Sequence, residues 1–139
     1  MTAKEYLNQA YRIDQRINSK VAQIASLRDL LTKTNAVISD MPGNPNRDRS
    51  RVDDIIVKII SIEDEIKTDI NTLLSTKSDI MHTIKAVDEP GCQMLLELRY
   101  LCFKSWEEIS EEMGYCSQHI YRIHTEALEM VEKIQNESK

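Results

Sequence analysis

The sequence predicts an all-α protein in which a long antiparallel helical hairpin, coiled-coil-like in its packing, precedes a C-terminal helix-turn-helix. The 139 residues include only 3 Gly and 3 Pro, and so few helix breakers leave room for few turns. Apolar residues recur every seven positions through residues 1–87, which is typical of helices packed along their length. Aromatic residues make up only 5%, so Ile, Leu, Val and Met must form the core.

Five of the six Pro and Gly residues lie in two short segments that divide the chain. These segments are MPGNPNRDRS at residues 41–50 and DEPG at residues 88–91. They predict one helix from about Thr2 to Ser39 and a second from about Arg51 to Val87. Two such helices joined by a short loop most simply fold back on each other. We therefore expect an oligomerising hairpin at residues 1–87 and a helix-turn-helix domain at residues 92–136.

Both predicted hairpin helices carry an apolar stripe. Thr2 with Glu5 forms a capping-box pattern for the first helix, and Ser50 with Asp53 is a candidate cap for the second. The first stripe contains Ala10, Ile13, Ile17, Ile24, Leu27, Leu31 and Ile38. The second contains Val52, Ile59, Ile66, Leu73, Ile80 and Val87, flanked by Ile55, Ile56, Ile62, Ile70 and Ile84. The width of the second stripe predicts a homodimer or higher homo-oligomer through the hairpin.

Four charged residues interrupt these stripes, namely Lys20, Glu63, Asp69 and Lys77. We interpret them as residues at the margin of the stripe whose charged ends reach water. The alternative is that they fix the register of a dimer at some cost in stability.

The C-terminal third has a different spacing. The segment from Cys92 predicts a short helix with Met94, Leu95, Leu98 and either Leu101 or Cys102 facing inward. Ser105 with Glu108 is a capping-box pattern for a further short helix. Its apolar face contains Trp106, Ile109 and Met113, and Gly114 is placed to end it in the left-handed conformation.

A longer final helix follows the turn at Gly114, with Cys116 or Ser117 as its cap. Its predicted buried side contains Ile120, Ile123, Ala127, Leu128, Val131 and Ile134. A short helix, a turn of three to four residues and a longer helix form a helix-turn-helix, whose second helix presents its outer N-terminal residues to the DNA major groove. Gln can pair with adenine, and Arg with guanine or phosphate. The predicted DNA-binding residues are Ser117, Gln118, His119, Tyr121, Arg122 and Thr125.

The run LLELRYLCFKSWEEISEEMGYCSQHIYRIHTEAL resembles region 4 of sigma-70 factors and of regulators that share its helix-turn-helix. Nearly the whole chain is similar to a group of phage proteins encoded in prophages of Gram-positive bacteria, near late-gene transcription regulators. The resemblance implies a phage-type transcriptional regulator that binds double-stranded DNA in the bacterial cytoplasm. The chain departs from sigma region 4 in having fewer Arg and Lys on the second helix.

The charge distribution sets limits on DNA binding. The net charge is −5, and residues 90–139 carry five Lys and Arg against nine Asp and Glu. This balance argues against tight, nonspecific DNA binding by a single subunit. A dimer gains affinity because it presents two helix-turn-helix motifs to the DNA. Arg47, Arg49 and Arg51 are interpreted as a solvated cluster, with a contact to the DNA backbone as the alternative.

The alternative function is a non-enzymatic protein-interaction or assembly factor, with a polymerase-binding role or a role in phage packaging or as a scaffold. The helix-turn-helix would then be a packing unit. Four acidic residues lie on the short helix, and we interpret them as a solvated face. The alternative is a contact with RNA polymerase or a neighbouring regulator. The four residues are Glu107, Glu108, Glu111 and Glu112.

The remaining observations predict what the protein does not do. Cys92, Cys102 and Cys116 do not follow a zinc-binding spacing, and no phosphate-binding loop or catalytic pattern occurs. We therefore expect no metal, no cofactor, no small-molecule substrate and no enzyme activity. The segment MTAKEYLNQAYR lacks the apolar centre of a signal peptide, and no apolar run is long enough to span a membrane. These features predict a cytoplasmic protein without a membrane partner.

Overall fold

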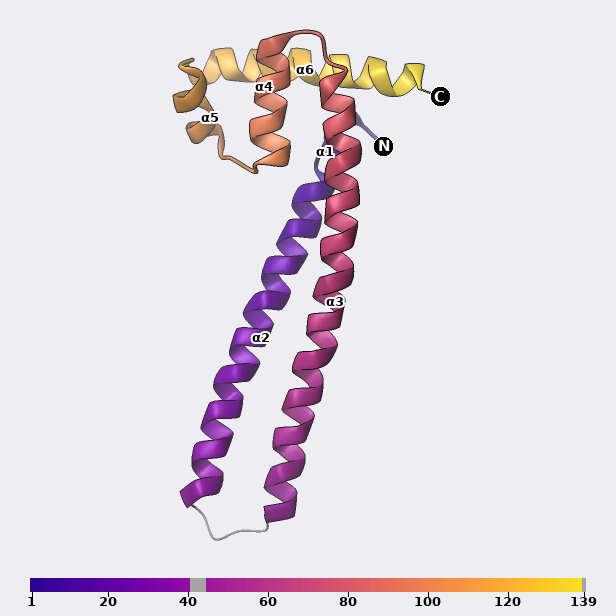
Figure 1. Cartoon of the computed structure of the whole chain (residues 1–139). Coiled ribbons are helices and arrows are strands. Elements are labelled where there is room, and N and C mark those ends of the chain that lie inside the picture. The colour runs from indigo at the N-terminus through magenta and orange to yellow at the C-terminus, as the bar shows by residue number, and fades with distance from the viewer. Residues whose placement is uncertain (41–44, 139) are drawn as a thin grey trace. The chain divides into compact units, whose positions relative to one another are not determined.

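A computed structural model describes residues 1–40 and 45–138, and every regular element in these ranges is a helix (Figure 1). The predicted all-α class is confirmed. The elements are α1 (Ala3–Leu7), α2 (Gln9–Asp40), α3 (Pro45–Lys85), α4 (Pro90–Leu96), the π-helical turn η1 (Glu97–Leu101), α5 (Trp106–Met113) and α6 (Ser117–Glu137).

The first predicted helix is two helices. The capping box is confirmed, because Thr2 Oγ1 accepts a hydrogen bond from the Glu5 N–H and the Glu5 carboxylate accepts one from the Thr2 N–H. The helix then breaks at Asn8, where ψ is −6°. α1 packs against α6, burying Ala3 and Leu7. The break therefore separates a short docking helix from the longer α2.

The second predicted helix starts earlier than expected. α3 begins at Pro45 instead of Arg51, so the predicted cap at Ser50 is wrong. Proline is well suited to the first position of a helix because the amide hydrogen that it lacks would have no partner there. The sequence from residue 46 to residue 50 then contains no further breaker.

The chain forms two compact units, and their boundary falls within α2 and α3. Unit 1 comprises residues 1–13 and 72–139, and unit 2 comprises residues 14–71. The functional division of the chain into residues 1–87 and 92–136 remains a prediction.

In unit 2, α2 and α3 pack along the predicted stripes. Ile24, Ile59 and Ile62 are buried, with Leu27, Ile55 and Ile66 packed against them. The side chain of Ile38 lies outside the described residues.

Three charged residues that interrupt the stripes, Lys20, Glu63 and Asp69, form ion pairs between α2 and α3 in unit 2. Lys20 Nζ lies 2.6 Å from Asp69 Oδ2, and Arg28 Nη2 lies 3.4 Å from Glu63 Oε1. The two pairs occur in opposite order along α2 and α3, so the helices run in opposite directions. The Lys20 and Asp69 side chains are only 23% and 13% exposed. Lys20 and Asp69 therefore form a largely shielded ion pair. The sequence predicts marginal positions with charged ends that reach water, and it does not predict this pairing.

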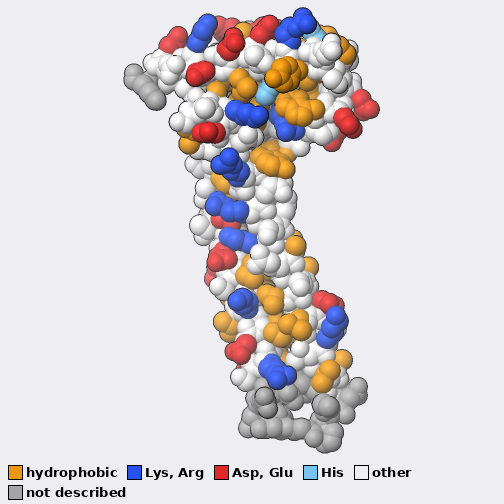
Figure 2. All heavy atoms as spheres, turned by 180° about the vertical axis from the view of Figure 1, so that it is seen from behind, with side chains coloured by type: hydrophobic (Ala, Val, Ile, Leu, Met, Phe, Trp, Pro, Cys, Tyr) orange, Lys and Arg blue, Asp and Glu red, His pale blue; other side chains and the backbone are white. Residues whose placement is uncertain are grey.

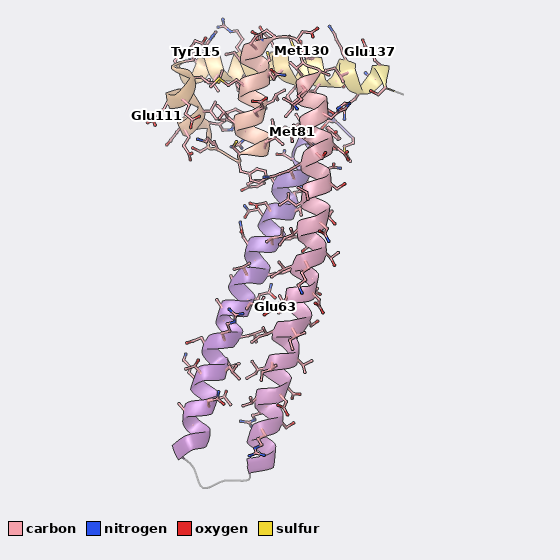
Figure 3. All side chains as sticks on the ribbon, viewed as in Figure 1. Glu63, Met81, Glu111, Tyr115, Met130 and Glu137 are labelled. Atoms are coloured by element: carbon pink, nitrogen blue, oxygen red, sulfur yellow. The ribbon has the colours of Figure 1, made fainter. Side chains whose placement is uncertain are left out.

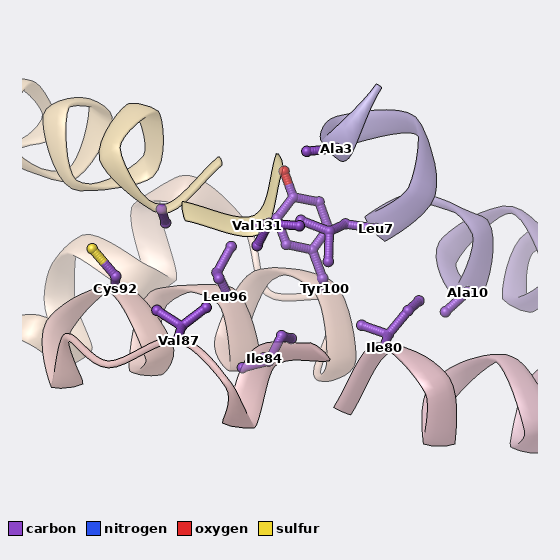
Figure 4. Packing of buried hydrophobic residues seen from close by; sticks show 11 residues of the cluster. Ala3, Leu7, Ala10, Ile80, Ile84, Val87, Cys92, Leu96, Tyr100 and Val131 are labelled. Carbon is purple, nitrogen blue, oxygen red and sulfur yellow. The ribbon is translucent and has the colours of Figure 1, made fainter. Parts of the chain in front are cut away.

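Unit 1 has its own core, shown in Figure 4. Ile80 and Ile84 of α3 and Leu96 of α4 are fully buried there, with Tyr100 of η1 and Val131 of α6. Elements far apart in the sequence thus share one apolar interior.

The inward face of the segment from Cys92 differs partly from the prediction. Leu95 is fully buried and Leu98 is half-buried, but Met94 is 43% exposed and Cys102 is also exposed. Cys92, Leu95 and Leu96 define the buried face of α4, and Met94 lies off it because one helical residue advances about 100°. The π-helical turn Glu97–Leu101 follows α4. Tyr100, which the prediction omitted, lies four residues after Leu96 and is buried with it in the core.

Candidate nucleic-acid interface

The connection between α5 and α6 is defined by short-range hydrogen bonds and one glycine. Ser105 Oγ accepts a hydrogen bond from the Glu108 N–H, which confirms the predicted cap of α5. Gly114 ends α5 at φ 71° and ψ 29°, a left-handed conformation that side chains with a Cβ disfavour. The Ser110 hydroxyl donates to the carbonyl of Tyr115. Cys116 is the cap residue of α6, but its side chain makes no capping hydrogen bond.

An apolar cluster holds α5 against α6 and α4. Ile109 of α5 and Leu95 of α4 are fully buried, and Ile120 of α6 is 2% exposed. Met113 and Ile123 pack against this cluster, as predicted. Because Ile120 faces inward, the residues on the opposite side of the first turns of α6 must face water.

A second contact between these helices centres on His124, which the sequence analysis did not select. Its Nε2 atom lies 2.6 Å from the Tyr100 hydroxyl, and either atom can donate the hydrogen bond. The rings of Trp106 and His124 meet edge-on with their centroids 4.7 Å apart. The Arg99 guanidinium lies 4.5 Å from the centre of the Trp106 ring. His124 is four residues after Ile120 and three before Ala127, and this spacing could have identified it as buried.

Burial determines the protonation states of His124 and Tyr100. Loss of water around the ring, with the charges of Lys4 and Arg99, lowers the pKa of His124 to about 4. Burial also raises the pKa of Tyr100 to about 12. Both side chains are therefore neutral near pH 7, and their hydrogen bond joins η1 to the middle of α6.

Most of the predicted DNA-binding residues form an exposed surface at the start of α6. Gln118 and Arg122 are exposed, and Tyr121 is 73% exposed. Ser117 is also exposed, as is Thr125, whose hydroxyl donates to the Tyr121 carbonyl at 3.1 Å. Their spacing places these five residues along one side of the helix.

His119 is the exception among the predicted residues, since its ring is held against the turn between α5 and α6. The ring contacts Tyr115 with centroids 4.4 Å apart in an edge-on arrangement. Tyr115 lies at that turn (Figure 3). This contact fixes the imidazole beside the turn, so only part of it is available to a ligand.

A small apolar hollow adjoins this surface. It is lined by Trp106, Ser117, Ile120 and Tyr121. Hydrophobic side chains and a histidine lie together at the surface of unit 1 in Figure 2. Aromatic and apolar groups in such a position can contact the methyl group of thymine.

The charges around the surface are unevenly distributed. The first turn of α6 contains no acidic residue. The four glutamates of α5 are exposed, and Glu112 pairs with Lys104, which raises the pKa of that lysine. Arg49 and Arg51 belong to α3, and Arg51 is exposed, whereas the side chain of Arg47 lies outside the described residues.

Among the described residues, no helix is both long enough and apolar enough to cross a membrane. A family match covers residues 30–132, from the second half of α2 to the second half of α6. The chain belongs to the family described as Protein of unknown function (DUF1492). No curated protein and no solved structure matches the chain.

Proposed function

We propose that this DUF1492 member is a DNA-binding transcriptional regulator of phage type, acting as a dimer or higher oligomer. α5, the turn at Gly114 and α6 form its helix-turn-helix, preceded by a helical hairpin that includes α2 and α3. The observation that carries the proposal is the exposed, non-acidic surface of α6 formed by Gln118, Tyr121 and Arg122.

The packing of unit 1 supports this reading surface. Ile109 and Ile120 are buried together, and His124 is held by Tyr100. These contacts fix the inner side of α6, so its outer side is a rigid platform, which suits insertion into a major groove. Gln118 offers a bidentate amide for adenine, and Arg122 offers a guanidinium for guanine or phosphate.

A single subunit attracts DNA only weakly, and this is why we propose an oligomer. With a net charge of −5, each subunit releases few counterions from DNA and binds weakly alone. Two subunits on one DNA duplex gain affinity through effective concentration without new contacts. Specific base contacts then contribute a larger share of the binding energy than phosphate attraction does.

Selection of bound fragments from phage genomic DNA, followed by electrophoretic shift on the selected site, tests the proposal. Arg122→Ala and Gln118→Ala should each reduce affinity for that site by about 5- to 150-fold, which corresponds to about 1–3 kcal/mol for a base contact. Lys133→Ala is the matched control, because Lys133 is an exposed basic residue near the other end of α6. Equal binding by all three variants, or no DNA bound by the wild-type chain, would contradict the proposed surface.

A protein-binding role is the second candidate, favoured by the acidic surface of α5. Glu107 and Glu111 are exposed, and neither forms an ion pair among the described residues. Such a surface suits a basic patch on a partner such as host RNA polymerase. Capture of purified polymerase without DNA, lost in Glu107→Lys/Glu111→Lys, would support this role over DNA binding.

A further inference from the structure

The outer surface of α3 in unit 2 carries a second series of regularly spaced residues. The residues Ile55, Ile59, Ile62 and Ile66 contribute to the core shared with α2. One position further along the helix, with the same alternation of four and three residues, lie Ile56, Ile60, Glu63, Lys67 and Ile70. Ile56, Ile60 and Ile70 are 40%, 53% and 49% exposed. This set of five residues, the outer stripe, is as regular as the buried seam but is uncovered.

The outer stripe continues onto α2 and is confined to one side of the helix pair. Val21, Ile24, Ala25 and Arg28 line a groove together with Glu63, and Val21 is 52% exposed. The positions of α3 on the other side of the buried seam are polar and exposed. They are Asp54, Lys58, Ser61, Glu65 and Thr68.

Four residues of the outer stripe, Ile60, Glu63, Lys67 and Ile70, are spaced symmetrically about position 65. Position 65 lies midway between Ile60 and Ile70 and also midway between Glu63 and Lys67. When two copies of α3 pack in opposite directions about a two-fold axis at this position, Ile60 meets the partner's Ile70. Glu63 then meets the partner's Lys67. Because a two-fold axis repeats every contact, this arrangement forms two apolar contacts and two contacts between opposite charges.

The charges of the stripe are available for these contacts. Lys67 makes no ion pair within the described part of the chain. Glu63 contacts Arg28 through Oε1 at 3.4 Å, and this pair is well exposed. A carboxylate has two oxygens and several acceptor positions, so Glu63 can accept from the partner's Lys67 as well.

We propose that the outer stripe of α3 is the interface with a second copy of this chain, arranged antiparallel about a two-fold axis at position 65. The proposal names the partner and the surface of the oligomer in the proposed function. It rests on that oligomer and does not depend on the DNA-binding surface. A different protein could bury the isoleucines equally well. A second copy accounts for the symmetric positions of Ile60 and Ile70 and of the two opposite charges.

Sedimentation of the full chain tests this interface with two single variants and their mixture. Glu63→Lys places Lys against Lys at both charge contacts, and Lys67→Glu places Glu against Glu. Each variant alone should dimerise at least about tenfold more weakly than wild type, because like charges facing each other across an interface are strongly unfavourable. Mixing the two variants should restore a heterodimer, since opposite charges then face each other again at both charge contacts.

Lys58→Glu is the matched control, because it makes the same charge change on the polar side of α3 and should leave dimerisation unchanged. Circular dichroism of each variant separates loss of the interface from loss of the fold. Three results would overturn the proposal: a monomeric wild-type chain, folded variants that dimerise as the wild type does, or a mixture that forms no heterodimer. DNA binding is measured separately, so a monomer that still shifts DNA would refute the interface and leave the reading surface standing.

Discussion

Lowering the pH from 7 to 5 should destabilise unit 1, because His124 is buried in its neutral form. The pKa of this histidine is about 4 in the folded chain, with burial as the main cause, and about 6.5 in an unfolded chain. The unfolded state therefore binds more protons than the folded state between these two values. The stabilising contribution is fully present above about pH 6.5 and is lost as the pH falls toward 4.

The size of the effect follows from the difference between the two pKa values. At about 1.4 kcal/mol per pKa unit, the full loss is about 3 kcal/mol, of which about 2 kcal/mol appears between pH 7 and pH 5. Glu89, whose pKa is lowered by hydrogen bonds from Cys92 and Gly91, loses its contribution only at more acidic pH, below its ordinary value of about 4.5. Between pH 7 and pH 5, the change in the free energy of unfolding therefore comes from His124 and not from Glu89.

Urea unfolding followed by tryptophan fluorescence measures this effect. Trp106 is the only tryptophan and contacts His124, so its signal reports unit 1. His124→Gln cannot titrate, and its free energy of unfolding should change much less between pH 7 and pH 5. His82→Gln, at an exposed position of α3, should follow the wild type. An equal loss of stability in wild type and His124→Gln would refute the assignment.

Three further predictions concern the local structure. Gly114→Ala should lower the free energy of unfolding by about 1 kcal/mol in a thermal melt, because only the positive φ opposes a Cβ that meets no atom within 4 Å. Ile109→Ala should cost about 2–5 kcal/mol in urea unfolding because this side chain is fully buried, whereas Met94→Ala, at a 43% exposed position of the same unit, should cost far less, and equal costs would contradict this packing. Lys20→Met should destabilise unit 2 by about 1–3 kcal/mol, measured by circular dichroism, because Asp69 loses its ion-pair partner in a largely shielded position; an unchanged melt would show that the pair contributes nothing.

Local features were predictable because they depend on residues close together in the sequence. The caps at Thr2 and Ser105 and the left-handed Gly114 are set by hydrogen bonds within a single turn of the chain. The exposed side of α6 was also predictable from local sequence, since Ile120 and Arg122 project in different directions on any helix. The break at Asn8 was not predictable, because it serves the packing of α1 on a distant element.

The sequence by itself determined the helical class, the heptad stripes and the surface on which Gln118 and Arg122 are exposed. The tertiary structure alone decided that Lys20 and Asp69 form an ion pair and that Tyr100 and His124 meet in the interior. The reason is physical. Periodicity and capping depend on the chain's own geometry over a few residues, whereas the partner that a charged or titratable side chain meets depends on which distant element packs against it.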